Sequence, residues 1–443
     1  MILSEVAALA REKKIRYYMI SFVEMNGISR AKLGPAETLE AVASDGVGFA
    51  GFAAGDLGQG PHEPDLMAVP DLSSLSVLPW QPGVAWLASN LYVNGRPWSF
   101  CPRTILQRVL DRARAGGYRL MAGMEPEFFL LRRENGRLAP FDPLDSSAKP
   151  CYNQQALSRN LEFVTRLVSS MNELGWGVYQ CDHEDANCQF EVNWRYSDVL
   201  NQCDRLTLAK FLIRSLAEQQ GLTATFMPKP FTNLTGNGCH YHLSLWDTAG
   251  QTNLLLDRGD AHGLSQTAYW FIGGLLKHAR ALAAITSPTV NSYKRLVTRP
   301  TNSGATWAPV YITYGGNNRT VMIRIPGPGR IEKRTVDGSA NPYLAAAAIL
   351  AAGLDGIEKR LDPGARFEEN TYSFTVGELQ SRGIEVLPAN LDEALDELEA
   401  DEVLCEALGR EYVNLYLKVK RREWDEYHNT VSEWELDRYL TVG

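Results

Sequence analysis

The segment from Met124 to Leu131 reads MEPEFFLL, and three later segments repeat its pattern of a chemically functional side chain at every second position. In this first segment Glu125 and Glu127 flank Pro126. The other three read CQFEVNW from Cys188, GCHYHLSLW from Gly238 and GRIEKRT from Gly329. Residues two apart on a β-strand point to the same face. Each segment is therefore predicted to be a strand that directs its polar side chains one way.

The alternating side chains are carboxylates, imidazoles and guanidiniums, with one amide. They are Glu125, Glu127, Gln189, Glu191, His240, His242, Arg330, Glu332 and Arg334. Any single pair would also fit an exposed strand face, but such faces usually carry lysine, threonine and serine. Carboxylates with an occasional imidazole suit hard divalent cations such as Mg²⁺ or Mn²⁺, and a phosphoryl donor needs a cation and arginines on its oxygens. The set predicts a channel lined by metal ligands and phosphate binders.

A glycine-rich segment, Thr235-Gly236-Asn237-Gly238, precedes the two histidines. Glycine lets the backbone approach a ligand closely because it has no Cβ. By itself this pattern is equally typical of a plain turn.

Composition limits the possible functions. A chain of 443 residues is too long for one small core, so two domains are predicted. A net charge of −8 argues against non-specific nucleic-acid binding. Seven cysteines, an odd number without a CxxC pair, argue against a disulfide framework or a zinc site. The first residues do not resemble a signal peptide, and the apolar run from Leu344 to Leu354 is too short to cross a bilayer. We expect a cytoplasmic enzyme with no membrane and no nucleic-acid partner.

The order of the patterns predicts the division into domains. Helical spacing over residues 2–14 precedes two strand-like runs, Tyr17–Glu24 and Val84–Val93, and each run is followed by an Asn-Gly turn signal. A composition shift near Pro102 precedes alternating helices and strands. The charged segment from Leu391 to Tyr427 is predicted to be helical, with Asn390 and Glu393 as a capping box at its start. We expect a sheet-rich domain over residues 1–100 and a larger domain over residues 101–443.

Taken in order, the segments resemble the glutamine synthetase family. The matching motifs are GMEPEFFLL, HEDANCQFEVN, ATFMPKP, TGNGCHYHLSL, PTVNSYKRLV, NNRTVMIRIP, GRIEKR and SANPYLAAAAIL. They cover about residues 100 to 440, and EPDLMAVPD extends the likeness more weakly toward the N-terminus. The resemblance implies an α+β fold, with an N-terminal β-grasp domain and a catalytic α/β domain built on a curved antiparallel sheet. It also implies a ring of six or twelve subunits, with each active site shared between neighbours.

The resemblance further implies roles for individual residues. Glu127, Glu184 and Glu191 match the ligands of the metal beside glutamate, and Glu125, His240 and Glu332 match those of the metal beside the ATP phosphates. Glutamate-binding positions are matched by Gly236, His240, Arg295, Arg319 and Arg334. ATP-binding positions are matched by His242, Ser244, Arg324 and Arg330.

The implied reaction is ATP-dependent ligation of an amine to the γ-carboxylate of L-glutamate. The carboxylate first attacks the γ-phosphorus of ATP, and the amine then displaces phosphate from the γ-glutamyl phosphate. Phosphorylation is needed because oxide is a hopeless leaving group. Arg319 is expected to neutralise the transferring phosphoryl group. Asp56, Asp65 and Glu184 are the candidates for the base that deprotonates the amine, and the sequence does not choose among them.

Two loops depart from the family pattern. Where glutamine synthetases carry an Asp-Gly-Ser-Ser motif that helps hold ammonium, this chain has Ala50-Gly51-Phe52-Ala53. Where a second acid precedes an Ala-Pro pair, this chain has Trp307, in a segment with about six extra residues after Arg295. An apolar and aromatic site suits an alkylammonium. We expect Ala50, Trp307 and Tyr152 to form an amine pocket for methylamine, and the chain in this respect resembles the γ-glutamylmethylamide synthetases, which join methylamine to glutamate.

Other functions stay open at this stage. Ammonia would make the chain a glutamine synthetase, and a polyamine would make it a γ-glutamylpolyamine synthetase, although no acid for a distal ammonium is evident. A catalytically dead scaffold would lack metal ligands, and all six are present. The glutamate-site motifs argue against a guanidino phosphotransferase. Tyr372 lies where some family members are adenylylated, but its surroundings match only partly and favour a packing role.

Overall fold

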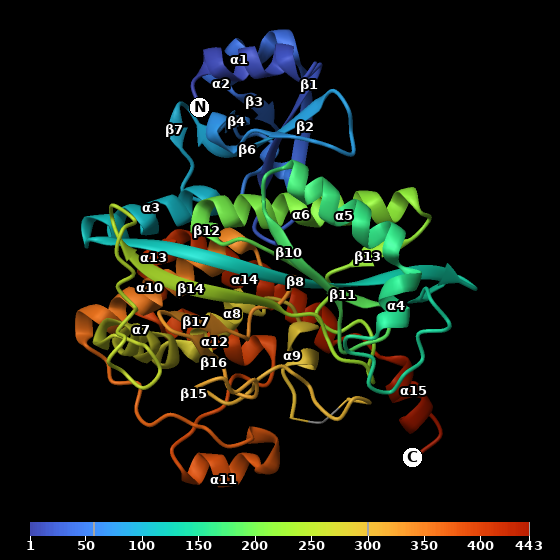
Figure 1. Cartoon of the computed structure of the whole chain (residues 1–443), viewed down its shortest axis with the longest axis vertical. Helices are drawn as coiled ribbons and strands as arrows, with labels where there is room; N and C mark the ends of the chain where they lie inside the picture. The colour runs from blue at the N-terminus through green and yellow to red at the C-terminus, as the bar shows by residue number, and fades with distance from the viewer. Residues whose placement is uncertain (56–57, 299–300, 443) are drawn as a thin grey trace.

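The computed structural model describes residues 1–55, 58–298 and 301–442, which form two β-sheets surrounded by helices (Figure 1). The strands of the first sheet are β1 (Tyr17–Val23), β2 (Ser29–Pro35), β3 (Val47–Phe49), β4 (Leu66–Pro70), β5 (Ser76–Val77), β6 (Val84–Val93) and β7 (Arg96–Pro97). Their order is β2-β1-β6-β4-β3, with β5 and β7 also paired to β6. The β1–β6 pair is parallel, and the others are antiparallel.

The turn between β1 and β2 is the hairpin predicted at Asn26-Gly27. Gly27 has a φ of +79°, which favours glycine. The fully buried carboxylate of Glu24 accepts hydrogen bonds from the backbone N–H groups of Asn26 (3.1 Å) and Ile28 (2.9 Å). The carbonyl of Glu24 accepts a bond of 2.8 Å from the Asn341 side chain. The hairpin is therefore fastened to the second half of the chain.

The second sheet contains all four segments predicted as strands. Its strands are β8 (Tyr118–Glu134), β9 (Arg137–Pro140), β10 (Val178–His183), β11 (Gln189–Trp194), β12 (Ser197–Asp198), β13 (Thr223–Thr225), β14 (Cys239–Asp247), β15 (Tyr314–Gly315), β16 (Ile323–Gly327) and β17 (Arg330–Lys333). Their order is β10-β11-β8-β14-β17-β16-β15, with β9, β12 and β13 also paired to β8. The four predicted strands are thus consecutive neighbours around β8, the long strand that crosses the centre of Figure 1.

Helices cover both sheets. Their bounds are α1 (Leu3–Glu12), α2 (Leu39–Asp45), α3 (Pro102–Ala115), α4 (Gln154–Arg159), α5 (Leu161–Glu173), α6 (Val199–Gln219), α7 (Gln266–Lys277), α8 (Ala279–Thr286), α9 (Ser292–Arg295), α10 (Pro342–Lys359), α11 (Val376–Ser381), α12 (Leu391–Ala400), α13 (Glu402–Leu408), α14 (Arg410–His428) and α15 (Glu433–Tyr439). Helices α3 and α6 pack against β8, and α10 packs against α3, α6, α7, α8 and α13.

Helix α10 contains the apolar run between Leu344 and Leu354, and most of its residues are buried. Its small alanines permit close packing by several neighbouring helices. Asn341 caps its start, since the side chain accepts from the N–H groups of Tyr343 (3.1 Å) and Leu344 (3.3 Å). At α12, Asn390 also caps the helix, but the Glu393 carboxylate accepts from the Ala389 N–H and the Asn390 side chain, not from the Asn390 N–H. The predicted capping box is therefore only half formed.

The first sheet joins the rest of the molecule through one of its faces. Ile20, Leu66 and Leu87 belong to a small core on the face that packs against α1 and α2. Trp86 and Ala88 belong to the main core. The structure contains the sheet-rich N-terminal part, while its β-grasp topology and the boundary at residues 100 and 101 remain predictions. None of the helices formed by the described residues combines the length and hydropathy needed to cross a membrane.

Candidate active site

Four adjacent strands place the predicted functional side chains on one face of the second sheet. The antiparallel registers oppose His240 with Glu125, His242 with Glu332, and Glu191 with Glu127. Directly opposed residues point to the same face of a sheet. The predicted strands and their common polar face are therefore confirmed.

This face lines a cavity of about 610 Å³. Of the residues predicted for the site, the cavity is lined by Glu125, Glu127, Tyr152, Glu184, Glu191, His240, His242, Trp307, Arg319, Arg324, Arg330 and Arg334. Residues that the sequence analysis did not name also line it, among them Asp182, Asp185 and Tyr179. Asp182 stands two positions before Glu184, so the same every-second-residue pattern could have identified it.

In the described part of the chain, acidic side chains and histidines gather in three groups, each with ligand atoms within 4.8 Å of one another. The groups are Glu125, His242 and Glu332; Glu125, Glu191 and His240; and Asp182, Glu184 and Glu191. Glu127 lies beside them, since its Oε1 is 3.9 Å from His240 Nδ1. The structure thus places Asp182 and His242 beside the six residues predicted from the sequence to be metal ligands.

The electrostatics of these groups fit bound divalent cations. Burial, followed by repulsion from Glu127 and Asp182, raises the pKa of Glu184 to about 8. Burial and neighbouring carboxylates also raise the pKa of Glu191 well above its usual range. Buried carboxylates that lie this close together can all be ionised only when a cation lies beside them. Among the described residues, His240 Nε2 and Asp182 Oδ1 are buried with no hydrogen-bond partner, so both can coordinate one. Oxygen-rich donors with an imidazole suit Mg²⁺ or Mn²⁺.

Arginines surround one carboxylate of the cluster. Glu332 accepts from Arg324 Nη1 at 2.6 Å and from Arg334 Nη1. Burial alone would raise the pKa of Glu332, but Arg334, His240 and the other nearby cationic groups lower it overall. Arg319 is exposed within the cavity, and no ion pair joins it to any carboxylate in the part of the chain that the structure describes. Its guanidinium is available to an anionic substrate.

The glycine-rich segment packs against the carboxylates with no room for side chains. The Gly238 N–H donates to Glu127 Oε2 at 2.7 Å. A Cβ on Gly238 would lie 2.8 Å from Arg295 Nη2, and one on Gly236 would lie 2.2 Å from the Pro228 carbonyl oxygen. The buried Arg295 is fixed by hydrogen bonds of 3.2 Å to the carbonyls of Thr335 and Arg334. This segment is therefore a close backbone approach to the site and not a plain turn.

A second cavity, of about 200 Å³, adjoins the first. His242 and Arg330 line both cavities, and Ser244, Tyr196 and Trp246 line only the smaller one. Three residues predicted to bind ATP, His242, Ser244 and Arg330, are thus grouped at one end of the site. Arg324, the fourth, lies in the larger cavity.

The predicted amine pocket is only partly assembled within one chain. Trp307 and Tyr152 line the main cavity. Ala50, just before the 3₁₀ turn Gly51–Ala54, and Asp65, just before β4, are exposed on the N-terminal part and do not line it. Asp56, a candidate base, lies outside the described residues. A site that includes Ala50 or Asp65 needs the N-terminal part of another chain.

The backbone of Trp307 is held in an unusual conformation. Its φ of +54° lies in the left-handed region, which a bulky residue adopts rarely. Its N–H donates to the Tyr372 hydroxyl at 3.0 Å, and its carbonyl accepts from Arg334 Nη2 at 3.3 Å. Nearby, Asp185 accepts from the hydroxyls of Ser303 and Thr235. These contacts fix the loop that presents the indole to the cavity, and they agree with the predicted packing role of Tyr372.

This chain is similar to known proteins both in sequence and in structure. A family model described as the catalytic domain of glutamine synthetase matches residues 99–439. A glutamine synthetase of Rhizobium leguminosarum bv. phaseoli is 48% identical over 438 residues, covering 99% of each chain. A glutamate–methylamine ligase of Methyloversatilis universalis is 48% identical over 440 residues, again covering 99% of each chain. A solved GmaS–ADP complex superposes with a TM-score of 0.92 at 51% identity, covering 98% of this chain and 99% of the other.

Proposed function

This chain belongs to the glutamine synthetase family and is an ATP-dependent glutamate–amine ligase, and on that premise we propose that its amine substrate is methylamine. The product would be γ-glutamylmethylamide. The relative named glutamate–methylamine ligase and the similarity to GmaS support this choice. The relative named glutamine synthetase, at the same 48% identity, makes ammonia the second candidate.

The observation that carries the proposal is the position of Trp307. Its side chain lines the same cavity as Glu184, Asp182 and Arg319. An indole beside the reacting centre offers apolar contact to a methyl group and a π-face to an ammonium. The acid that family members carry at this position would instead favour the small, strongly hydrated ammonium ion.

The first step requires a carboxylate and a triphosphate to meet in one cavity. We assign the glutamate substrate to the side of Gly236, Arg295 and Arg334, and ATP to the side of Ser244 and Arg330. The γ-carboxylate oxygen forms a bond to the γ-phosphorus, the bond to the ADP oxygen breaks, and Arg319 and Arg324 stabilise the transferring phosphoryl group. His240 and the acidic residues would hold Mg²⁺ or Mn²⁺, which supply charge neutralisation on the phosphates.

In the second step the amine nitrogen bonds to the carbonyl carbon of the γ-glutamyl phosphate, and the bond from that carbon to the phosphate oxygen breaks. The attacking nitrogen needs a free electron pair, and an alkylammonium has a pKa near that of lysine, about 10.4. A base must therefore remove a proton first. Glu184 lines the cavity and fits this role within one chain, while Asp65 could serve only from a neighbouring subunit.

We propose that the chain works as a ring of six or twelve subunits. The exposed positions of Ala50 and Asp65, away from the cavity of their own chain, support a site shared between neighbours. A ring closes such a head-to-tail contact without leaving free ends.

The test is a steady-state panel of amines with saturating ATP and glutamate, scored by kcat/KM and by the mass of the product. Methylamine should exceed ammonia, ethylamine and putrescine, and γ-glutamylmethylamide should be the product. Hydroxylamine in place of the amine should trap the acyl phosphate as γ-glutamyl hydroxamate, and a chelator should abolish that product. If ammonia instead gave the highest kcat/KM of the panel, the chain would be assigned to glutamine synthesis.

A further inference from the structure

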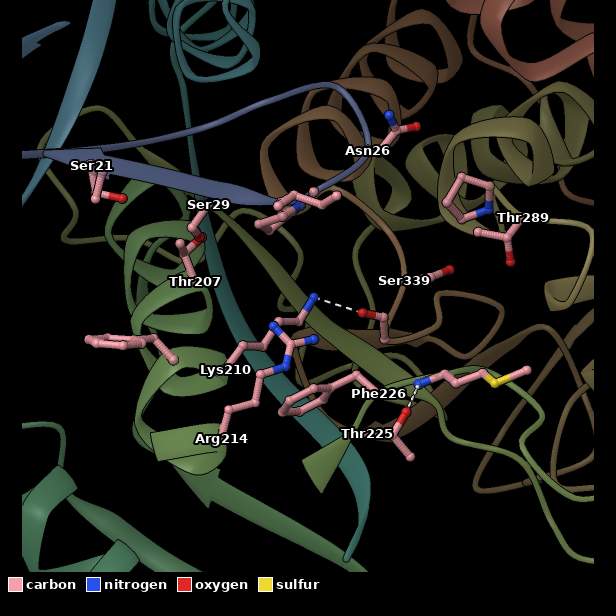
Figure 2. A pocket seen from close by; sticks show the side chains of 18 of the residues that line it. Ser21, Asn26, Ser29, Thr207, Lys210, Arg214, Thr225, Phe226, Thr289 and Ser339 are labelled. Carbon is pink, nitrogen blue, oxygen red and sulfur yellow. Dashed lines mark hydrogen bonds between the residues drawn. The ribbon is translucent and has the colours of Figure 1, made fainter. Parts of the chain in front are cut away.

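One cavity of the described structure lies away from the active site. Its volume is about 690 Å³, and it lies between the first sheet and later parts of the chain, α6 among them. Ser21 of β1 and Ser29 of β2 line one side, and helix α6 lines the other, as Figure 2 shows. It shares no lining residue with the metal-binding cavity. The glutamate, ATP and amine sites do not account for it.

Two cations of α6 face this cavity around one aromatic ring. Lys210 Nζ lies 5.8 Å from the centre of the Phe226 ring, and the Arg214 guanidinium carbon lies 5.1 Å from it. Figure 2 shows both side chains projecting from the helix beside Phe226. Lys210 is 9% exposed, and its only hydrogen bond among the described residues is a 2.7 Å contact to the Gly338 carbonyl. Two positive charges thus converge on one wall.

Two carboxylates act on this pair only from a distance, Glu218 of the same helix on Arg214 and Asp337 on Lys210. Neither Lys210 nor Arg214 forms an ion pair within the described part of the chain. Of the described acidic residues, Glu423 alone lines the cavity, and it is engaged by Lys420 Nζ at 2.9 Å and by the Val290 N–H at 3.2 Å. Buried charges in proteins are normally paired, because an unpaired ion loses its hydration without compensation. Burial lowers the pKa of Lys210 to about 8, the direction expected of an ammonium that lacks a partner.

The other residues that line the cavity indicate which further groups a fitting ligand carries. Trp86, Phe211 and Phe226 supply apolar and aromatic surface. The hydroxyl groups of Ser21 and Ser29 supply neutral donors at the edges. A ligand that fits this lining carries an anionic group at one end and a flat or apolar body at the other.

We propose that this cavity binds a small organic anion, a carboxylate or a phosphate ester with an apolar body, through Lys210 and Arg214. The contact of Lys210 with Gly338 connects the cavity to catalysis. Gly338 follows Asp337, which pairs with Gly238 in an isolated β-bridge and interacts electrostatically with Arg295. An anion that draws Lys210 away from the Gly338 carbonyl would act on the glutamate side of the active site. The occupant is therefore an effector of the enzyme and not a substrate.

The experiment measures binding of benzoate and phenyl phosphate to the assembled enzyme by calorimetry, with benzamide as the uncharged probe of the same shape. Both anions should bind saturably, and benzamide should bind at least tenfold more weakly. A preference between the two anions distinguishes a carboxylate from a phosphate ligand. Lys210→Met and Arg214→Met should each weaken binding at least tenfold, while Arg214→Lys should stay within about threefold of wild type.

Two control variants test whether the probes bind in this cavity and not at another cationic surface. Arg205→Met alters an arginine of the same helix that packs on Trp176 outside the cavity, and it should bind the probes as wild type does. Arg319→Ala alters the active site and should also keep the binding. In wild type, the bound anion should change the KM for glutamate at least twofold, and Lys210→Met should abolish that change.

The absence of saturable binding in wild type would overturn the proposal. Binding that survives both Lys210→Met and Arg214→Met, or that disappears with Arg319→Ala, would also overturn it. Binding with no effect on the KM for glutamate would overturn the effector role. The binding measurement does not depend on which amine the enzyme uses, so a failure here is distinguishable from a failure of the proposed function.

Discussion

Arg319 and Arg324 differ in what they contact, although both line the catalytic cavity. Arg324 is engaged by Glu332 and by the Asn317 side chain, at 2.6 and 2.8 Å, and so has a fixed position. Arg319 is exposed in the cavity. A guanidinium without an internal partner can follow the charge that develops as the phosphoryl group transfers.

We expect Arg319→Ala to lower kcat by about 100-fold and to leave the KM for ATP within about threefold, because the lost contact acts mainly in the transition state. Steady-state kinetics of glutamate-dependent phosphate release would measure both parameters. Arg330→Ala is the matched comparison, since Arg330 lines both cavities and should mainly raise the KM for ATP. A pure KM effect of Arg319→Ala would remove this residue from the catalytic role.

Tyr372 positions the indole of Trp307 without lining the cavity itself. Tyr372→Phe removes the acceptor of the Trp307 N–H, and an unpaired N–H of this kind costs about 1–3 kcal/mol. The loop should then lose its fixed conformation, and the ratio of kcat/KM for methylamine over ammonia should fall at least threefold, with the KM for ATP unchanged. Tyr314→Phe is the control, because its hydroxyl donates to the Gly364 carbonyl at 2.8 Å, outside the cavity. Equal ratios in wild type and Tyr372→Phe would refute the positioning role.

At the scale of elements, the alternating pattern correctly predicted which side chains the second sheet directs to one face. Glu125, Glu191 and His240 were placed correctly on strands with a common face, because a period of two is a local property of the backbone. The order of the strands in the sheet depends on long-range pairing, and no local pattern could supply it. The conformation of the Trp307 loop likewise could not be predicted from local sequence patterns, since it depends on Tyr372 and Arg334, which are distant in the chain.

Arg103 at the start of α3 links the first sheet to the helical layer. Its guanidinium donates to both carboxylate oxygens of Asp204 on α6, at 3.0 and 2.9 Å, and to Asp71 at 2.7 Å. Arg103 is 4% exposed. Tyr343 donates to the same Asp204 at 2.7 Å. This network is invisible in local patterns because its members lie far apart in the sequence.

Arg103→Met should lower the free energy of unfolding by about 3–5 kcal/mol, because it leaves the buried Asp204 carboxylate without its cation. Urea denaturation followed by circular dichroism would measure the change. Arg119→Met is the matched control, since the pair of Arg119 with Asp198 is 3.3 Å long and partly exposed, and its loss should cost less than about 1 kcal/mol. Equal losses in the two variants would contradict the importance assigned to the buried network.

At the scale of the whole molecule, the account requires an active site completed by a neighbouring subunit. Ala50→Trp should block the amine site of the next subunit, and Glu127→Ala should disable the metal site of its own. Co-expression of the two inactive variants should restore about one quarter of wild-type activity. In a ring assembled at random, about half of the subunits have an intact metal site, and about half of these adjoin a neighbour with an intact amine site. Activity assays on purified mixed rings would measure the recovery. No recovery, or a fully active monomer in sedimentation, would contradict the shared site.

The most direct test of the central claim is a competition between methylamine and ammonium at equal concentrations, with the two products quantified by mass spectrometry. The product ratio equals the ratio of the two kcat/KM values. The account predicts at least about ten molecules of γ-glutamylmethylamide for each glutamine, a difference of about 1.4 kcal/mol, and a shift toward glutamine in Trp307→Glu that Ala50→Asp increases. A wild-type enzyme that makes mainly glutamine, or a ratio that neither substitution moves, would contradict it.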